Sequence, residues 1–387
     1  MKCTPFSQLD VKNKRIFVRA DLNVPLEEEK IENPFRIQAI LPTIDTILKK
    51  GGKVILATHM GRPSAPISGL STATIASWLA ANGYKVRFEA NLGKAQKDSS
   101  KNFDEVMILE NLRFFPGEGT DDQVFAQTLS NLADCYVNEA FGLIHRKNTS
   151  ITLLPRLFSQ KTRALGPLME KEIAAFENLK KQPKETFSLI LGGVKVSDKL
   201  PLIEHFLKKA KNILICPPLS FTFMHALGQS VGSSLIDKHS TKKALEILEK
   251  AKGKTNIFLP KDYVVAYKSM QGKLSTINYD EFGPDLVGIT VGPKTIELFE
   301  SALQKTKALF VNGLPGFLNR PETLIGTKKI LGIIKKSNTY SMVGGGDSVA
   351  MVQQLDLEQN VNFLSTGGGS AIAFLSHLPL PGIAWCR

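Results

Sequence analysis

The sequence is poor in the residues that build metal sites, disulfide frameworks and stacking surfaces. Its 387 residues include only four cysteines, six tyrosines and two tryptophans. The cysteines, at positions 3, 135, 216 and 386, are scattered without Cys-x-x-Cys spacing, which argues against a metal site. Their usage fits a reducing compartment. With few stacking aromatics and no arginine-rich run, the chain is a poor candidate for binding nucleic acid.

Long apolar runs are also absent. No run approaches the roughly 20 residues that a membrane span needs, and Met1–Ser7 carry no apolar signal segment. We therefore expect a cytoplasmic protein with no membrane partner. The apolar fraction of 43% and the charged fraction of 22% are those of an ordinary globular chain. The length predicts two domains, because single hydrophobic cores stop growing at roughly 250–300 residues.

Charge of one sign is in excess. The formal net charge is +13 and is spread along the chain, which favours an anionic partner such as nucleic acid, a membrane surface or a phosphorylated metabolite. Two common nucleotide-binding motifs are missing. There is no Gly-x-Gly-x-x-Gly fingerprint, and Gly253-Lys254-Thr255 is not a Walker A loop because Leu248 occupies the position of its first glycine.

Short apolar strands alternate with amphipathic helices. Helices are expected near 37–48, 72–81, 122–132 and 168–180. Strands are expected at 15–20, 53–58, 85–88, 106–109 and 134–137, and then at 187–191, 212–216, 256–260, 286–290, 308–311, 340–343 and 361–364. This alternation predicts an α/β fold with doubly wound parallel sheets of the Rossmann-like type.

A break in the alternation separates the two halves. Ala164-Leu165-Gly166-Pro167 and the later Gln182-Pro183 bracket a single helix. We therefore place a first lobe at 1–166, a connecting hinge helix at 167–182 and a second lobe at 183–376. Ligand sites often form at domain interfaces, and domain closure can exclude water from phosphoryl transfer.

Charged and polar side chains follow the strands of the first half. They are Asp21 and Asn23, His59 and Arg62, Arg113, and His145 with Arg146, while Arg36 begins a helix. Ligands of parallel sheets bind at the carboxyl ends of the strands, and arginine forks hold carboxylate or phosphate. Each residue alone is more often a solvated charge or a structural histidine. Their repetition predicts a site for a small, multiply charged anion, in which Asp21 either orients an arginine, binds a substrate hydroxyl or forms a structural charge pair.

Glycine turns follow the strands of the second half. Gly192 to Lys199 reads as a strand end, a glycine turn and a helix start, where backbone N–H groups can bind an anion. Lys195 and Lys199, four residues apart, can then reach one polyphosphate. Further glycine turns lie at 344–346 and 367–369. Asp347, directly after one of them, is either a magnesium ligand or a helix N-cap.

These motifs, taken in order, resemble the phosphoglycerate kinase family along nearly the whole chain. In the first half the matching segments are 18–25, Arg36-Ile37, 59–63, 110–114, Phe141-Gly142 and His145-Arg146. In the second half they are 192–199, 259–262, 292–295, Asn312-Gly313, 344–347 and 365–369. The resemblance implies two lobes joined by a helix, with residues 377–387 returning to the first lobe. It implies transfer of a phosphoryl group from 1,3-bisphosphoglycerate to ADP, with magnesium and by hinge closure of the lobes.

The resemblance also implies residue roles. The positions implied to hold 3-phosphoglycerate are Asp21, Leu22, Asn23, Arg36, His59, Met60, Gly61, Arg62, Arg113 and Arg146. Those implied to hold ATP or ADP are Lys199, Asn312, Asn319, Gly345, Gly346, Asp347 and Ser348, and Asp347 is also the implied Mg²⁺ ligand. Arg36, Lys195 and Lys199 are the implied catalytic residues, acting by positioning and charge neutralisation. We expect a monomer.

The chain departs from the family pattern around the nucleoside. Cys216-Pro217-Pro218 stands where the family carries glycines, and prolines remove backbone donors. Asn319 replaces a ribose-binding glutamate, and Thr290 replaces an aspartate. Two alternatives to an active kinase therefore stay open: a catalytically weak kinase-like protein that binds nucleic acid or other anions through its basic surface, and another α/β phosphate enzyme. The missing dinucleotide fingerprint disfavours the second alternative.

Overall fold

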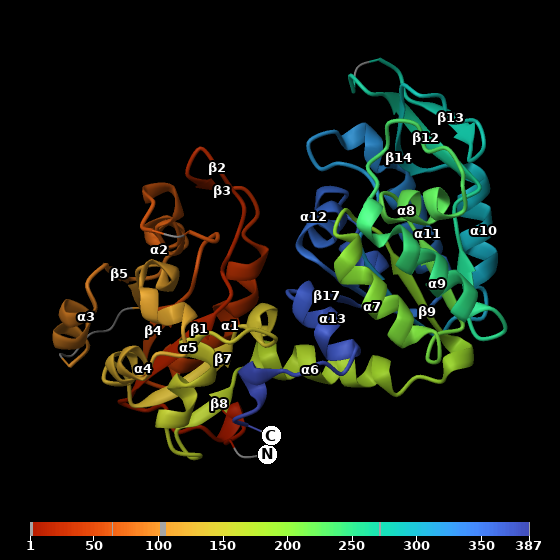
Figure 1. Ribbon diagram of the computed structural model, residues 1–387. Coiled ribbons are helices and arrows are strands. Elements are labelled where there is room, and N and C mark those ends of the chain that lie inside the picture. The colour runs from red at the N-terminus through yellow and green to blue at the C-terminus, as the bar shows by residue number, and fades with distance from the viewer. Residues whose placement is uncertain (1–2, 64, 101–105, 271, 387) are drawn as a thin grey trace. The chain divides into compact units, whose positions relative to one another are not determined.

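The computed structural model describes residues 3–63, 65–100, 106–270 and 272–386, which divide into two compact units (Figure 1). Unit 1 comprises Met1–Ala174 and Leu378–Arg387, and unit 2 comprises Ala175–His377. The division falls inside helix α6 (Pro167–Lys180), so this helix belongs partly to each unit. It differs from the expected boundaries at that helix and at His377, which lies in unit 2 rather than in the returning tail.

Unit 1 is built on a six-stranded sheet in which all neighbouring strands are parallel. In spatial order the strands are β5 (Val86–Glu89), β6 (Val106–Leu109), β4 (Lys53–Ala57), β1 (Arg15–Ala20), β7 (Cys135–Glu139) and β8 (Arg163–Leu165). The chain builds the sheet outward from β1, first through β4 to the β5 edge and then back to β7 and β8. Carboxyl ends of strands on either side of such a reversal form a ligand-binding crevice.

The longest helix of unit 1, α1, packs on this sheet through an apolar stripe. In α1 the isoleucines at 37, 40, 44 and 47 follow helical spacing and are at most 1% exposed. They pack in one core with Ile16 and Val18 of β1. The helices are α1 (Phe35–Lys49), α2 (Ala73–Ala81), α3 (Leu92–Ser99), α4 (Gln123–Ser130) and α5 (Thr149–Thr152), with 3-10 turns at η1 (Phe6–Gln8), η2 (Ser68–Leu70), η3 (Leu112–Phe114), η4 (Pro116–Gly119), η5 (Phe141–Leu143), η6 (Leu154–Leu157) and η11 (Pro381–Ile383).

Unit 2 repeats the plan with a second parallel sheet of six strands. In spatial order they are β11 (Asn256–Phe258), β10 (Asn212–Ile215), β9 (Phe187–Leu191), β15 (Ala308–Asn312), β16 (Tyr340–Gly344) and β17 (Phe363–Ser365). The first strand in sequence, β9, is again central, so β9 and β15 flank the reversal. Both are buried along their whole length, as expected for strands covered on both faces. The expected doubly wound parallel fold is therefore confirmed in both units.

The helices of unit 2 lie between these strands in sequence. They are α7 (Val196–Phe206), α8 (Leu219–Ala226), α9 (Thr241–Ala251), α10 (Pro293–Leu303), α11 (Ile325–Lys336), α12 (Gly346–Gln354) and α13 (Gly369–Leu375), with 3-10 turns at η7 (Lys184–Thr186), η8 (Lys238–Ser240), η9 (Pro321–Leu324) and η10 (Glu358–Asn360). None of the helices in the described part of the chain is both long and apolar enough to cross a membrane.

An antiparallel sheet interrupts the alternation in unit 2. Strands β12 (Asp262–Tyr267), β13 (Ser275–Asn278) and β14 (Leu286–Val291) pair in the order β13-β12-β14 and form a separate layer at the top of this unit in Figure 1. The sequence analysis was wrong to read 286–290 as part of the parallel series and did not predict β12 or β13. Tyr263, Phe221 and Phe282 hold this layer against α8, with ring centroids 5.2–6.1 Å apart.

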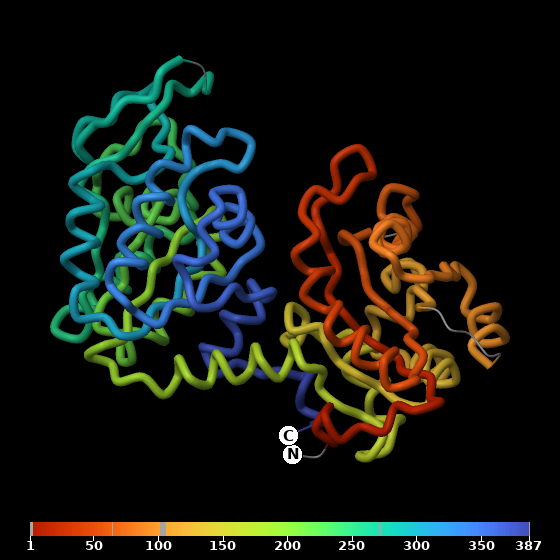
Figure 2. The backbone as a smooth tube through the Cα atoms, turned by 180° about the vertical axis from the view of Figure 1, so that it is seen from behind, coloured from red at the N-terminus to blue at the C-terminus, as the bar shows by residue number. Residues whose placement is uncertain are grey.

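Unit 1 also contains elements that the sequence patterns did not predict. Helix α3 and the short antiparallel pair β2 (Leu26–Glu27) and β3 (Lys30–Ile31) are examples. The segment read as a break before the connecting helix begins with β8, the edge strand beside β7. The first and last described residues, Cys3 and Cys386, both belong to unit 1, where the N-terminal and C-terminal segments lie side by side (Figure 2).

Candidate functional site

The carboxyl ends of β1 and β4 hold the centre of a polar cluster in unit 1. Asp21 follows β1 and is 7% exposed. Its Oδ1 lies 2.9 Å from Nη1 of Arg36 and 4.0 Å from Nε2 of His59. Asn23 accepts a hydrogen bond at Oδ1 from the Gly61 backbone (2.8 Å), and its carbonyl accepts one from Arg36 (3.2 Å). The structure therefore brings these predicted residues together at the strand ends.

Asp21 is an arginine-orienting carboxylate. Burial is the largest single influence and disfavours the charged form, but Arg36 and the other surrounding cations, with the Asn23 backbone N–H, together outweigh burial and hold the pKa of Asp21 below its usual value. Burial is also the largest cause of the strongly lowered pKa of His59, whose neighbours include several arginines. His59 is consequently neutral at pH 7, and its Nδ1 has no hydrogen-bond partner among the described residues.

A second group of arginines completes this cluster with an excess of positive charge. Burial and then the neighbouring Arg146 and Arg19 lower the pKa of Arg113 to about 10. Burial and then Arg62 lower the pKa of Arg146. Nη1 of Arg113 also donates to the carbonyl of Gly61. Because these cations repel one another where water is partly excluded, an anion bound among them would be strongly stabilised.

Leu22 and Met60 belong to the loops that carry the polar cluster, but their own side chains are not available to a ligand. Leu22 is fully buried and Met60 is 1% exposed, both within the core of unit 1. Their backbones fix the loops, since Leu22 N–H donates to Thr58 Oγ1 (2.9 Å) and the Met60 carbonyl accepts from Asn111 (2.9 Å). Gly142 is required for a different reason: a Cβ there would collide with Oδ2 of Asp21.

A buried ion pair that the sequence analysis missed ties three of these segments together. Glu118 of η4 and Arg19 of β1 are each 1% exposed and lie 3.4 Å apart. Glu118 also accepts from the backbone N–H (3.0 Å) and the hydroxyl (2.7 Å) of Ser150 on α5, and Arg19 Nε donates to the same hydroxyl (2.8 Å). In sequence, Arg19 lies shortly before Asp21, Glu118 shortly after Arg113, and Ser150 shortly after Arg146. Nothing in the Pro-Gly-Glu-Gly string of η4 indicates this role.

In unit 2 the loops after β9 and β15 touch through their backbones. Gly192 N–H donates to the Asn312 carbonyl (3.0 Å), and a Cβ on Gly192 would collide with the Gly313 carbonyl. A Cβ on Gly313 would in turn collide with the Gly192 carbonyl, and Gly313 has φ +98°. Only glycine allows this approach. The two loops flank the reversal of the sheet, where a nucleotide-binding crevice is expected.

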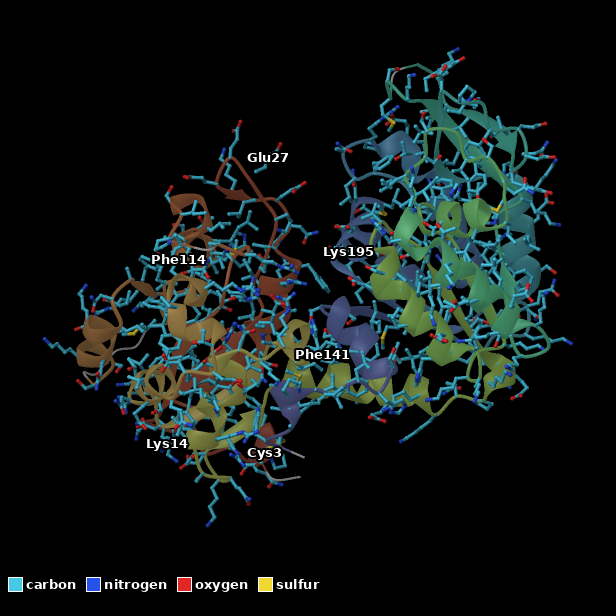
Figure 3. The ribbon with its side chains drawn as sticks, in the orientation of Figure 1. Cys3, Lys14, Glu27, Phe114, Phe141 and Lys195 are labelled. Atoms are coloured by element: carbon cyan, nitrogen blue, oxygen red, sulfur yellow. A yellow bond between two sulfur atoms is a disulfide. The ribbon has the colours of Figure 1, made fainter. Side chains whose placement is uncertain are left out.

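Two lysines lie at the start of α7, beside these loops. Lys195 is exposed at the surface of unit 2, where Figure 3 labels it. Lys199 is only 7% exposed, and its Nζ donates to the Asn312 carbonyl (3.4 Å). Burial lowers the pKa of Lys199 to about 8, against the opposing effect of Asp198. The positive charge of the Lys199 ammonium is thus only weakly offset by nearby negative charge, so an anionic ligand would be favoured beside it.

The other predicted nucleotide residues are of two kinds. Asn312 and Ser348 are buried and hold loops together: Asn312 Nδ2 donates to the Gly344 carbonyl (2.8 Å), and Ser348 Oγ accepts from Gly313 N–H (2.9 Å). Asp347 is exposed in the first turn of α12, whose N-cap is Gly345 with no side-chain cap. The reading of Asp347 as an N-cap is therefore wrong.

Gly346 begins α12, and Gly345 before it has φ +102°, which glycine adopts without strain. Asn319 is exposed in the turn that follows β15, and among the described residues its side chain makes no hydrogen bond to the loops above. Among the described residues there is no cluster of three or more histidine, cysteine, aspartate or glutamate side chains that could hold a metal by itself.

A cavity of about 470 Å³ opens beside the glycine turn of unit 2. Its walls come from the start of α7, from Pro218 and from the segment before η8, namely Val194, Lys195, Val196, Ser197, Asp198, Pro218, Leu235, Ile236 and Asp237. Small-molecule sites usually measure roughly 300–1,000 Å³. Pro218 therefore shapes one wall and leaves the space open. Leu235 and Ile236 were not predicted, because nothing near them in sequence marks a ligand site.

Two further motifs prove to be structural partners. Asp262 is 2% exposed and accepts from Lys294 N–H (2.9 Å), Thr295 N–H (2.8 Å) and Thr295 Oγ1 (2.7 Å). Its carboxylate thus caps the N-terminus of α10. The Leu-Pro-Lys-Asp and Gly-Pro-Lys-Thr segments are joined by these hydrogen bonds in unit 2. Both motifs therefore have a structural role as well as any role in ligand binding.

Two doubly wound units, one with clustered arginines and one with a glycine turn and a buried lysine at its strand ends, define a phosphotransferase of the kinase class. The comparisons with known proteins are specific. A family model described as phosphoglycerate kinase matches residues 6–377. The chain therefore belongs to the phosphoglycerate kinase family.

Individual relatives agree with the family model. Phosphoglycerate kinases of Dictyoglomus turgidum and Finegoldia magna are 38% and 39% identical, each covering 97% of this chain and 96% of the relative. The solved phosphoglycerate kinase of Pyrococcus horikoshii has a TM-score of 0.87 at 28% identity and covers 98% of both chains. That of Coxiella burnetii has a TM-score of 0.81 at 28% identity, over 99% of this chain and 98% of its own.

Family membership assigns the chain its reaction class. It is a kinase of glycolysis that transfers a phosphoryl group between 1,3-bisphosphoglycerate and ADP, giving 3-phosphoglycerate and ATP. The alternative of a catalytically weak protein that binds nucleic acid receives no support from these comparisons.

Proposed function

We propose that the arginine cluster of unit 1 binds 3-phosphoglycerate and that the glycine loops of unit 2 bind the nucleotide. The observation that carries the first half is the closeness of the partly buried Arg113, Arg146 and Arg62 to one another and to Asp21, which pairs with Arg36. A ligand carrying both a phosphate and a carboxylate satisfies several guanidinium groups at once. We include in this site the side chains of His59 and Asn23 and the backbone of their loops, residues 21–23 and 59–62.

Arg36 is the proposed catalytic residue of unit 1. Its guanidinium is fixed by Asp21 Oδ1 and by the Asn23 carbonyl, so it is preorganised to neutralise charge on the reacting carboxyl-phosphate. The attacking oxygen of 3-phosphoglycerate is a carboxylate that is already ionised at neutral pH. The reaction therefore needs no general base, and positioning with charge neutralisation supplies the catalysis.

Lys195 and Lys199 are the proposed catalytic residues of unit 2. An anionic phosphate beside Lys199 would favour the charged form of a side chain whose pKa burial lowers to about 8. Exposed Lys195, four residues earlier, is free to follow the transferring phosphoryl group. The backbone N–H groups at Gly345 and Gly346, at the start of α12, would bind phosphate oxygens.

The cavity beside the glycine turn is the proposed nucleoside site. Pro218, Leu235 and Val194 give it apolar walls that suit the faces of a purine. Asn312 and Ser348 contribute by holding the phosphate loops, and Asn319 is proposed to reach a ribose hydroxyl. A nucleoside can therefore still bind here, although Cys216, Pro217 and Pro218 stand where the family carries glycines.

Asp347 is the proposed magnesium residue. Its exposed carboxylate stands in the first turn of α12 beside the proposed phosphate loop. A single carboxylate fits Mg²⁺, because this ion completes its shell with water and substrate phosphates rather than with a protein cage. When bound, the ion would neutralise charge on the nucleotide phosphates.

We further propose that the two lobes close about α6, which contributes residues to both units. The first lobe includes the returning tail. Each unit carries only half of the reacting groups, and closure would exclude water from the transferring group. The protein is proposed to be a cytoplasmic monomer.

A coupled assay of ATP-dependent phosphorylation of 3-phosphoglycerate tests the assignment. We expect turnover in the unmodified protein, a loss of several orders of magnitude in Lys199→Ala and in Arg36→Ala, and little change in Lys242→Ala, an exposed lysine of α9. Binding titrations separate the two halves, since Arg36→Ala should weaken 3-phosphoglycerate and leave ATP unaffected.

Three results would contradict the proposal or part of it. Background activity in the folded, unmodified protein would remove the catalytic assignment altogether. A mild effect of Arg36→Ala on turnover would remove Arg36 from the catalytic residues, because a group facing the transferring phosphoryl cannot be dispensable. Equal losses in Lys242→Ala would show that the assay reports general charge rather than the site.

A further inference from the structure

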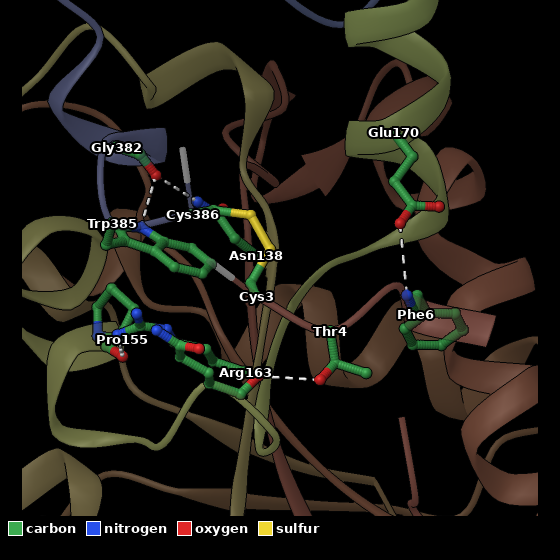
Figure 4. The surroundings of a disulfide bond; sticks show 11 residues. Cys3, Thr4, Phe6, Asn138, Pro155, Arg163, Glu170, Gly382, Trp385 and Cys386 are labelled. Carbon is green, nitrogen blue, oxygen red and sulfur yellow. Dashed lines mark hydrogen bonds between the residues drawn. A yellow bond between two sulfur atoms is a disulfide. The ribbon is translucent and has the colours of Figure 1, made fainter. Parts of the chain in front are cut away.

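Two cysteines near opposite ends of the sequence meet in unit 1. Cys3 and Cys386 are 383 positions apart, yet their Cα atoms lie 5.0 Å from each other and a disulfide joins them (Figure 4). This Cα separation is within the usual range for a disulfide. The sequence analysis treated the cysteines as scattered, and the fold brings this pair together.

The segment that follows Cys3 is anchored by its backbone. Thr4 N–H donates to the carbonyls of Gln160 and Arg163, each at 3.1 Å, and its hydroxyl donates to Gln160 (2.9 Å). Phe6, two residues further, is buried and donates its N–H to Glu170 (3.4 Å). Cys3 is therefore held in place by contacts that do not depend on its sulfur.

The segment that precedes Cys386 is anchored as firmly. Trp385 is 4% exposed, packs edge-on against Tyr136 with centroids 5.7 Å apart, and has the Arg163 guanidinium 5.5 Å from its ring centroid. Gly382 N–H donates to the Ile144 carbonyl (2.9 Å). Arg163 thus contacts both segments, and these contacts would keep the two sulfurs adjacent when the bond is reduced.

The four cysteines differ in their access to reagents. Cys3 is half-buried, Cys386 is 1% exposed, and Cys135 and Cys216 are fully buried. Burial raises the pKa of Cys135 to about 11 and raises that of Cys216 as well, so both remain thiols. Cys3 is thus the one cysteine of the four that is not buried, and it is the first candidate for reaction with a reagent in solution.

We propose that Cys3 and Cys386 form a reversible thiol–disulfide site, closed by exchange with a low-molecular-weight disulfide and opened by a dithiol reductant. The Cys3 thiolate attacks one sulfur of the small disulfide, whose S–S bond breaks and releases one thiol. The Cys386 thiol then loses its proton and displaces the second small thiol from Cys3. Two protein thiols are thereby oxidised and one small disulfide is reduced to two thiols.

The bond fastens a tail that supports the anion site. Asn138 Nδ2 donates to the Gly382 carbonyl (3.1 Å), and Gly382 in turn reaches Ile144. Between Asn138 and Ile144 the chain forms η5, which Phe141 marks in Figure 3, and it then continues to Arg146. Oxidation therefore adds a covalent restraint to the segment that presents Arg146, and reduction leaves the tail held by these non-covalent contacts alone.

Thiol labelling tests the site in the full-length protein. Reduced protein is exposed to an alkylating reagent with and without prior incubation in glutathione disulfide, and peptides are mapped by mass spectrometry. We expect Cys3 to be alkylated at least about tenfold faster than Cys386 before oxidation. After oxidation both should be blocked and joined in one linked peptide, while Cys135 and Cys216 react only after denaturation.

Unfolding of unit 1 tests the consequence. Both tryptophans, Trp78 and Trp385, lie in this unit, so tryptophan fluorescence reports its unfolding. We expect the oxidised protein to unfold at a temperature roughly 4–8 °C higher than the reduced protein. Cys3→Ser and Cys386→Ser should each unfold at the reduced value and show no response to reductant.

Several outcomes would overturn the proposal. They are four free thiols after equilibration with glutathione disulfide, a linkage between chains rather than within one, or identical unfolding temperatures of oxidised and reduced protein. A faster reaction at Cys386 than at Cys3 would overturn the proposed order of exchange. None of these results depends on kinase activity, so they leave the proposed function untouched.

Discussion

Gly142 offers the sharpest test of how the anion site is held in shape. It lies in η5, and a Cβ built on it would collide with Oδ2 of Asp21 and come within 3.1 Å of Cγ. Gly142→Ala therefore places one methyl group against the carboxylate that orients Arg36. The substitution adds no charge, and the three atoms nearest to the added methyl all belong to Asp21.

The size of the effect follows from the geometry. Real Cβ atoms essentially never approach another heavy atom within 3.0 Å, so the carboxylate must retreat by about 1 Å or more. That displacement breaks the 2.9 Å bond from Arg36 to Asp21. Loss of a charged hydrogen bond costs about 1.5–3 kcal/mol, which corresponds to roughly 10- to 140-fold in affinity for 3-phosphoglycerate.

Steady-state kinetics with each substrate varied in turn provide the assay. We expect KM for 3-phosphoglycerate to rise by the factor above in Gly142→Ala, and KM for ATP to change less than about twofold, because the nucleotide loops lie in the other unit. Gly119→Ala is the matched control, since Gly119 is exposed and nothing lies within 4 Å of its added methyl.

A double-mutant cycle decides whether Asp21 transmits the effect. In an Asp21→Ala background the obstructed carboxylate is gone, so Gly142→Ala should add almost nothing. Unchanged KM in the single variant, or an equal effect of Gly142→Ala with and without Asp21, would refute the reasoning. Circular dichroism confirms that each variant is folded.

Three further expectations concern stability and charge. Glu118→Ala leaves Arg19 buried without its partner and should cost about 3–5 kcal/mol in urea unfolding followed by tryptophan fluorescence, whereas Glu118→Gln should cost less. Gly332→Ala, inside α11 with open space around it, should raise the free energy of unfolding by about 0.5–1 kcal/mol in urea titrations followed by circular dichroism. Lys199, whose pKa is about 8, loses its charge above that pH. ATP affinity in binding titrations should then fall by up to about tenfold per pH unit, and Lys199→Arg should abolish this dependence.

The parallel sheets were predictable because their strands carry a strong local signal. Strands such as β1 and β9 are short apolar runs ended by a polar or glycine turn, and each is followed by an amphipathic helix. Position after a strand for Asp21 and His59, and at a helix start for Arg36, predicted that these residues would gather, and the structure brings them together.

The remaining features depend on contacts between distant residues. The antiparallel layer forms because β14 pairs with β12 instead of joining the parallel sheet, and the residues of β14 resemble any other buried strand. The pairing of Glu118 with Arg19 spans 99 positions, and the Cys3–Cys386 bond spans 383. No local pattern encodes such partners, since a buried carboxylate or cysteine looks the same in sequence as an exposed one.

The return of the chain to unit 1 has a consequence for biosynthesis. The hydrogen bond from Asn138 to Gly382 joins residues 244 positions apart. Residues 378–386 leave the ribosome after every residue of unit 2, so unit 2 is complete in sequence while unit 1 still lacks Trp385 and its partners. Unit 1 therefore reaches its final packing last, although most of its residues are made first.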